Sequence, residues 1–140
     1  MTALPQLEHA VEIEVPFHDC DPAGIVWHGN YARYFEVARC ALLEKLGYNY
    51  DHMAGSGYAW PLIDFHARYL KPLRFKQRVR VRARIVEWEY RLKMDFLVTD
   101  AVSGERLTKG STMQVALDCK TFEMQLMSPA ILLEKLGVSK

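Results

Sequence analysis

Apolar and polar positions change their period along the chain. Residues 11–15 read Val-Glu-Ile-Glu-Val, an alternation typical of a strand with one buried face. From Tyr31 to Leu46 the apolar residues recur at helical spacing, so the pattern predicts an amphipathic helix over 31–46. We expect Asn30 to be its N-cap and Gly47 to be the glycine that ends it.

The rest of the chain reads mostly as strands. The pattern predicts a loop at residues 55–57, a hairpin turn at Ser103-Gly104 and a short helix over 129–136 that Ser128 caps and Gly137 ends. Strands are predicted over residues 61–69, 79–85, 92–100, 107–117 and 122–127. One long helix packed on a run of antiparallel strands buries both apolar faces, so the predicted fold class is α+β.

The composition is that of an ordinary globular protein. The 140 residues are 50% hydrophobic and 25% charged, with a formal net charge of +1. This predicts one domain over residues 1–140, with no overall attraction to nucleic acid or a membrane. We find no signal-peptide pattern and no apolar run near the roughly 20 residues of a membrane helix. Cys20, Cys40 and Cys119 are odd in number and widely spaced, which predicts reduced thiols in the cytoplasm.

Reactive side chains gather directly before the predicted helix, in the stretch FHDCDPAGIVWHGNY at residues 17–31. A helix N-terminus offers unpaired backbone N–H groups that can polarise a carbonyl oxygen. The N–H groups of His28, Gly29 and Asn30 are the candidates. Asp21 lies on a turn beside Pro22, where it could attack an acyl carbonyl or draw a proton from water. The residues alone therefore indicate an acyl-transfer or anion site.

Each of these residues also has a purely structural interpretation. Asp followed by Pro is common in turns, and a lone His more often opens a helix than it catalyses. Cys20 is more typical of a small buried side chain than of a nucleophile. His18, Asp19, Asp21 and His28 are possible metal ligands, but their spacing matches no compact ligand motif, so we expect no metal.

The sequence DCDPAGIVWHGNYARYFEVAR, at residues 19–39, resembles the signature of the 4-hydroxybenzoyl-CoA thioesterase branch of the hotdog-fold acyl-CoA thioesterases. A second match is YLKPLRF, at residues 69–75. The resemblance covers about residues 10–127. It implies a long central helix wrapped by a curved antiparallel sheet, paired into homodimers or homotetramers. It also implies hydrolysis of an acyl-CoA to a free acid and CoA, without a cofactor.

The resemblance assigns roles to single residues. Asp21 matches the catalytic carboxylate, as nucleophile or general base, and Asp19 matches a structural or supporting residue. The backbone N–H of His28 is implied to polarise the thioester carbonyl, beside that of Gly29, and its imidazole to assist water or substrate. Glu36 matches an acidic helix position without a role. Substrate-binding candidates are Trp27, Tyr31, Arg74 and Arg91. The namesake enzymes carry a basic cluster after a strand Trp, where this chain has Trp88-Glu89-Tyr90-Arg91 with one basic residue.

Residues 65–86 contain no acid and eight Arg or Lys residues: Arg68, Lys71, Arg74, Lys76, Arg78, Arg80, Arg82 and Arg84. One interpretation is a solvated sheet face. The other is an anion platform for the phosphates of CoA or for an acidic acyl carrier protein. Nucleic acid is disfavoured because stacking aromatics are sparse. Three hypotheses follow: an acyl-CoA thioesterase, an acyl carrier protein thioesterase of the same fold, and a non-catalytic acyl-CoA-binding subunit.

Overall fold

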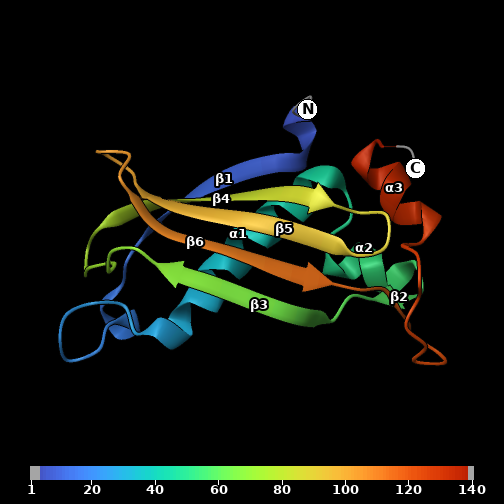
Figure 1. Cartoon of the computed structure of the whole chain (residues 1–140), viewed down its shortest axis with the longest axis horizontal. Coiled ribbons are helices and arrows are strands. Elements are labelled where there is room, and N and C mark those ends of the chain that lie inside the picture. The colour runs from blue at the N-terminus through green and yellow to red at the C-terminus, as the bar shows by residue number, and fades with distance from the viewer. Residues whose placement is uncertain (1–3, 139–140) are drawn as a thin grey trace.

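The computed structural model describes residues 4–138. Within this range, five antiparallel strands form one sheet in the order β1-β4-β5-β6-β3 (Figure 1). Hairpin connections join β4, β5 and β6, while β1 and β3 lie at the two edges. The strands are β1 (Glu8–Glu14), β3 (Leu62–Tyr69), β4 (Arg78–Glu87), β5 (Leu92–Asp100) and β6 (Arg106–Gln114). The predicted strands over 11–15, 61–69, 79–85, 92–100 and 107–117 each have a counterpart here.

Helix α1 (Tyr31–Leu46) crosses one face of this sheet, as predicted (Figure 1). Gly47 ends it with a left-handed φ of 74°, which a residue with a Cβ adopts at a cost. Asn30 is its N-cap residue, as predicted, but the Asn30 side chain makes no cap hydrogen bond. A 3₁₀ turn, His28–Asn30, precedes α1, and the Asn30 amide donates to the Asp19 carbonyl over 2.9 Å. The fold class is α+β.

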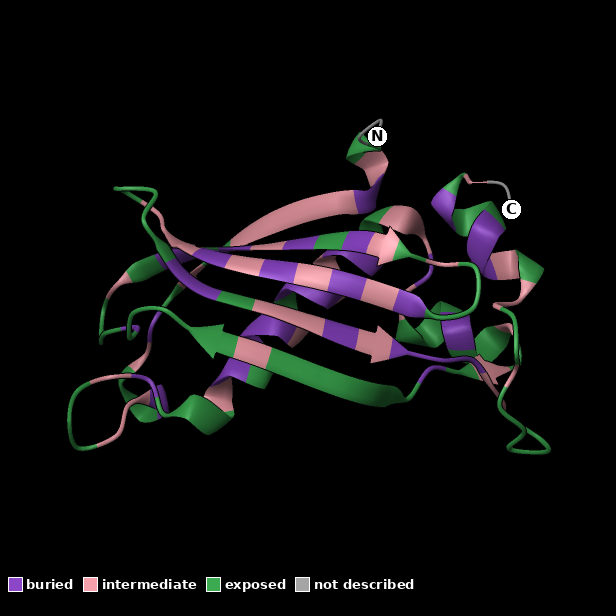
Figure 2. Ribbon diagram, in the orientation of Figure 1, coloured by how far each residue is buried: buried purple, intermediate pink, exposed green. Residues whose placement is uncertain are grey.

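The core lies between α1 and the sheet. Alternate residues of β4 and β5 are buried toward the helix, which gives these strands their banded appearance in Figure 2. The Phe35 ring of α1 stacks on Phe96 of β5 with centroids 4.5 Å apart. The opposing strand has no side chain at Gly110, where a Cβ would lie 2.3 Å from the Phe35 ring. The helix can therefore lie close to the sheet only because this position is glycine.

The remaining elements cover the ends of the sheet. Helix α2 (Tyr50–Gly55) was not predicted and ends where the expected 55–57 loop begins. Strands β2 (Tyr58–Ala59) and β7 (Leu117–Asp118) pair with each other. The predicted strand over 122–127 is wrong, since it is irregular except for one bridge from Met124 to Leu117. Helix α3 (Ala130–Leu136) ends at Gly137 as predicted, but Pro129, not Ser128, is its N-cap.

Strand β3 leaves one edge of the sheet open. Seven of its eight residues are exposed, and it is green along nearly its whole length in Figure 2. Among them are the apolar side chains of Leu62, Ile63 and Phe65. An uncovered edge with apolar side chains is suited to pairing with another strand. Within residues 4–138, every helix is too short or too polar to span a lipid bilayer.

Candidate active site

A tight loop places Asp21 at one end of the molecule. Cys20 and Val26 form a bridge, and the Asp21 N–H donates to the Ile25 carbonyl over 2.9 Å. Gly24 closes the turn with a φ of 80° and donates its N–H to the Asp21 carbonyl. The Oδ1 of Asp21 accepts the Ala23 N–H over 2.8 Å. The other carboxylate oxygen accepts no hydrogen bond from the residues that the structure describes, so it is available to a ligand.

The loop is fixed to the second segment of the sequence signature. The Val26 N–H donates to the Leu73 carbonyl over 2.8 Å, and Ile25 forms a bridge with Arg74. The two segments recognised separately in the sequence, 19–39 and 69–75, therefore meet in space at Asp21.

Asp19 holds the loop to the start of α1. It is 3% exposed, and its carboxylate accepts hydrogen bonds from Arg33 and, over 2.8 Å, from the Tyr34 hydroxyl. Its carbonyl accepts the Trp27 N–H and the Asn30 amide. Burial, followed by the Asp19 carboxylate, raises the pKa of Tyr34 above its usual range. With its acceptors engaged and its side chain buried, Asp19 braces the loop, in keeping with the supporting role that the sequence implied.

Two backbone N–H groups remain open beside Asp21. Those of His28 and Gly29 have no acceptor within the described residues, whereas that of Asn30 donates to the Trp27 carbonyl over 2.9 Å. Asn30 is thus removed from the predicted trio. Trp27 packs over Gly29 so closely that a Cβ there would lie 2.1 Å from its ring. The glycine therefore leaves room for the ring, which a residue with a Cβ would not.

A pocket of about 320 Å³ brings Asp21 and His28 together, while Gly29 is not among the residues that line it. Asp21, His28 and Tyr31 line it from the loop and helix, and residues 69–72 line it from the chain that follows β3. The Tyr69 ring meets Tyr31 edge to face at 4.7 Å, and its hydroxyl donates to the His28 carbonyl over 3.3 Å. Sequence reasoning assigned no role to Tyr69, although the YLKPLRF match contained it.

Three predicted substrate-binding residues do not line this pocket: Trp27, Arg74 and Arg91. Trp27 packs on Gly29 and is half exposed. Arg74 is exposed and faces a neighbouring hollow with Lys71 and Lys76. Arg91 follows β4 at the opposite end of the sheet, 3.0 Å from Glu87. There it lines a second pocket of about 900 Å³ that is mainly apolar, with Ile63, Trp88, Tyr90 and Leu126. Within one chain, Arg91 and Asp21 are therefore not brought together.

The other reactive groups of the stretch are less suited to chemistry. Burial, then the neighbouring Asp19 and Asp21, raises the pKa of the Cys20 thiol, which disfavours the thiolate that a nucleophile requires. Across residues 4–138, no three side chains of His, Cys, Asp or Glu are grouped so that they could hold a metal ion.

A long helix packed on an antiparallel sheet, with a carboxylate and an unpaired backbone N–H group lining one pocket, is an arrangement suited to acyl transfer. Comparison with known proteins identifies the family. The family model of the thioesterase-like superfamily matches residues 15–134. The chain therefore belongs to this superfamily, and it is a thioesterase with the hotdog fold that the sequence resemblance implied.

Three related proteins illustrate the similarity. A Bacillus subtilis protein named "Putative acyl-CoA thioesterase YneP" is 30% identical over 113 residues, covering 80% of this chain and 81% of that protein. The crystal structure of the DHNA-CoA thioesterase from Staphylococcus aureus has a TM-score of 0.78 at 30% identity and covers 85% of this chain and 80% of its own. The chloroplastic acyl-acyl carrier protein thioesterase ATL3 of Arabidopsis thaliana is 31% identical over 80% of this chain and 60% of that protein.

Proposed function

We propose that this thioesterase hydrolyses acyl-CoA thioesters to a free acid and CoA in the pocket around Asp21, as one catalytic domain over residues 1–140. The observation that carries the proposal is that one pocket is lined both by Asp21, which has a carboxylate oxygen free of hydrogen bonds, and by His28, whose backbone N–H has no acceptor within the described residues. The N–H of the adjoining Gly29 has no acceptor there either. The names of the Bacillus and Staphylococcus relatives support a CoA substrate.

The proposed chemistry divides between backbone and side chain. The thioester carbonyl oxygen accepts hydrogen bonds from the His28 and Gly29 N–H groups, which stabilise the negative charge that develops there. Asp21 either attacks the carbonyl carbon, forming an anhydride and expelling CoA as thiolate, or takes a proton from the water that attacks. In the first route water then hydrolyses the anhydride and regenerates the carboxylate. The His28 imidazole is exposed at the mouth of the pocket, where it can assist the water.

The first test is thiol release from a panel of short, long and aromatic acyl-CoAs. We expect Asp21→Asn to lower kcat by about 10²–10⁴-fold, the usual worth of a positioned acid or base. Asp51→Asn, which changes an exposed carboxylate of α2, is the matched control and should keep wild-type turnover. Turnover that survives in Asp21→Asn would refute the assignment. A wild-type protein that binds CoA but releases no thiol would favour the non-catalytic binding subunit.

Single turnover in ¹⁸O-water separates the two routes. Label that first enters the Asp21 carboxylate supports the anhydride, and label that enters only the product acid supports direct attack by water. Cys20→Ala should retain activity, because the raised pKa of the thiol disfavours it as a nucleophile.

We also propose that two copies pair through β3 and that the site is shared between them. Antiparallel pairing about a two-fold axis sets the Tyr69 end of one β3 beside the Leu62 end of the other. Tyr69 lines the Asp21 pocket, and Ile63 lines the apolar pocket of Trp88 and Arg91. The partner subunit's Arg91 would then face the Asp21 pocket, where it suits a phosphate of CoA.

The oligomeric state and Arg91 are tested together. Sedimentation equilibrium should give a homodimer or a homotetramer built from such dimers, and Arg91→Ala should raise KM for acyl-CoA with a smaller change in kcat. Lys120→Ala, at another exposed cation, is the control. A fully active monomer would contradict the shared site.

An acyl carrier protein thioester is the second candidate substrate. The name of the Arabidopsis relative favours it, and so does the charge on the outer face of the sheet. Comparing kcat/KM for one acyl group on both carriers decides between them, since a clear preference for CoA would exclude the carrier protein.

A further inference from the structure

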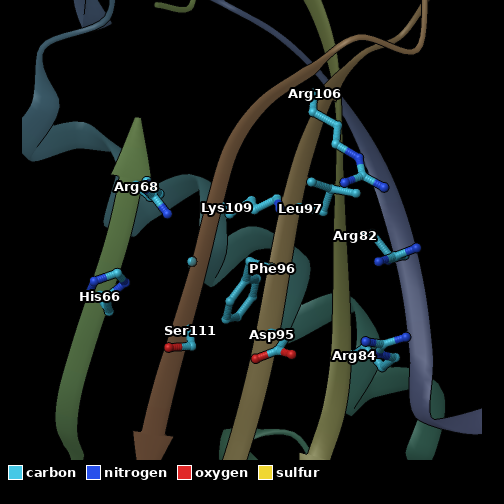
Figure 3. A pocket seen from close by; sticks show the side chains of 11 residues that line it. His66, Arg68, Arg82, Arg84, Asp95, Phe96, Leu97, Arg106, Lys109 and Ser111 are labelled. Atoms are coloured by element: carbon cyan, nitrogen blue, oxygen red, sulfur yellow. The ribbon is translucent and has the colours of Figure 1, made fainter. Parts of the chain in front are cut away.

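The sheet face that points away from α1 carries a cluster of cations with no role in the proposed chemistry. Figure 3 shows arginine and lysine side chains extending from β3, β4 and β6 around a hollow of about 460 Å³. The cations are Arg68, Arg82, Arg84, Arg106 and Lys109. His66 and Ser111 lie beside them, and Asp95 is the carboxylate in this hollow.

The half of this face formed by β1 and β4 has glutamates opposite its arginines, and Arg78 and Arg82 form ion pairs with them. Glu8, Glu12 and Glu14 of β1 are in register with arginines of β4. Arg82 lies 3.8 Å from Glu8, and Arg78 lies 3.8 Å from Glu14. Alternating charges across paired strands are the arrangement that a solvated sheet face favours.

The half formed by β6 and β3 is not balanced. Arg68 and Lys109 are directly opposite each other in the β3–β6 register. Neither they nor Arg106 lie within 4.0 Å of a carboxylate in the part of the chain that the structure describes. Like charges opposite each other on paired strands destabilise a sheet. Such a pair is therefore better explained by an external anion than by the stability of the fold.

The shape of the cluster indicates the size of that anion. The cations are spread over three strands on an open face. Of the two aromatic rings that line the hollow, Phe96 is buried against α1 and the His66 imidazole is exposed. Single-stranded nucleic acid would find one small ring, that of His66, in place of the series of rings on which successive bases stack. A broad acidic protein surface needs no such ring and can meet separated cations at once.

The cluster adjoins the candidate active site along the chain. Arg68 is followed directly by Tyr69, which lines the Asp21 pocket. The N–H groups of Leu70 and Lys71 both donate to the Leu107 carbonyl of β6, and Lys71 forms an ion pair with Glu105, beside Arg106. The cations without ion pairs and the wall of the Asp21 pocket thus belong to one segment that is hydrogen-bonded to β6. They lie on opposite faces of the same end of the sheet.

We propose that the outer face of β6 and β3 docks the acidic surface of an acyl carrier protein. The carrier's pantetheine arm, which CoA shares, passes around Tyr69 so that its thioester enters the Asp21 pocket. This inference rests on the proposed thioesterase function, and it adds where the second candidate substrate binds.

The test measures binding separately from turnover. Holo acyl carrier protein is titrated against the wild type, Arg68→Glu/Lys109→Glu, and Lys120→Glu/Lys135→Glu, with fluorescence anisotropy as the readout. The last variant changes two exposed cations outside the cluster by the same net charge. We expect the Kd to rise by about tenfold or more in the first variant, because like charges then face each other, and to stay within about twofold in the control. Arg68→Gln/Lys109→Gln removes the two charges without reversing them and provides a milder variant if the charge reversal impairs folding.

Several results would overturn the inference: no carrier binding by the wild type, equal weakening in the control, or no change in either cluster variant. Duplex DNA that binds the wild type more tightly than the carrier, and loses that binding in the cluster variants, would assign the face to nucleic acid instead. An equal loss of kcat/KM on acyl-CoA and on the acyl carrier would assign the cluster to the phosphopantetheine arm that both substrates carry. Failure of the proposed hydrolysis is recognised separately, since it leaves carrier binding and its loss in the variants unchanged.

Discussion

The buried hydrogen bond between Asp19 and Tyr34 should be worth more to stability than any other polar contact of the Asp21 loop. Asp19→Ala removes a charged acceptor from a Tyr34 hydroxyl that is itself 2% exposed, which should cost about 1.5–3 kcal/mol. Arg33 adds only about 0–1 kcal/mol, because its side chain is 49% exposed. The sum, about 1.5–4 kcal/mol, should lower the Tm by about 5–12 °C for a chain of this size.

The same change should also impair catalysis below the unfolding temperature. Asp19 sets the path of the loop between Asp21 and the open N–H groups, and a misplacement of about 1 Å can cost roughly 10²-fold in rate. A double-mutant cycle of Asp19→Ala with Tyr34→Phe, followed by thermal unfolding and by thiol release, isolates the contact. A double variant whose loss of stability equals the sum of the two single losses would show that the two side chains are not coupled, and the explanation of the loop's stability would be wrong.

Two further predictions concern the fold. In a denaturant titration, Gly110→Ala should lower the free energy of unfolding by about 1–3 kcal/mol, since the new Cβ meets the buried Phe35 ring. The control Gly55→Ala has open space around it and should be neutral or slightly stabilising. The Asp100 carboxylate accepts hydrogen bonds from Gln77, Ser103 and Val102, which lower its pKa from 3.8 to about 2. Because folding lowers the pKa of Asp100, the ionised Asp100 carboxylate stabilises the fold above about pH 4, and this stabilisation is lost as the pH falls through about 2. The Tm of Asp100→Ala should therefore lie below that of the wild type at about pH 7 and approach it at about pH 2.

The spacing of apolar residues predicted the helices and strands that bury only one face. The bounds of α1 and β5 agree with the prediction because their apolar positions face a single core and because Gly47 marks the end of the helix. Residues 122–127 also alternate, but Phe122, Met124 and Leu126 are exposed, so their pattern does not report a buried face. Helix α2 was missed because it is short and begins with the Asn49–His52 capping box, in which His takes the usual place of Glu or Gln.

The candidate site was predicted where it is local in sequence. Asp21, His28 and Gly29 lie within one loop, so helix-start chemistry alone could indicate them. The loss of the Asn30 N–H to Trp27 depends on a 3₁₀ turn that the sequence pattern does not report. Tyr69 and the distant position of Arg91 depend on tertiary structure, and only the resemblance to known thioesterases pointed to either region.

The open edge of β3 has a consequence for genetics. In the proposed dimer, each site takes Asp21 from one chain and Arg91 from the other. A mixed dimer of one Asp21→Asn chain and one Arg91→Ala chain then holds one site with both substitutions and one with neither. Two alleles that are each impaired would complement each other in the same cell, although neither encodes an intact protein.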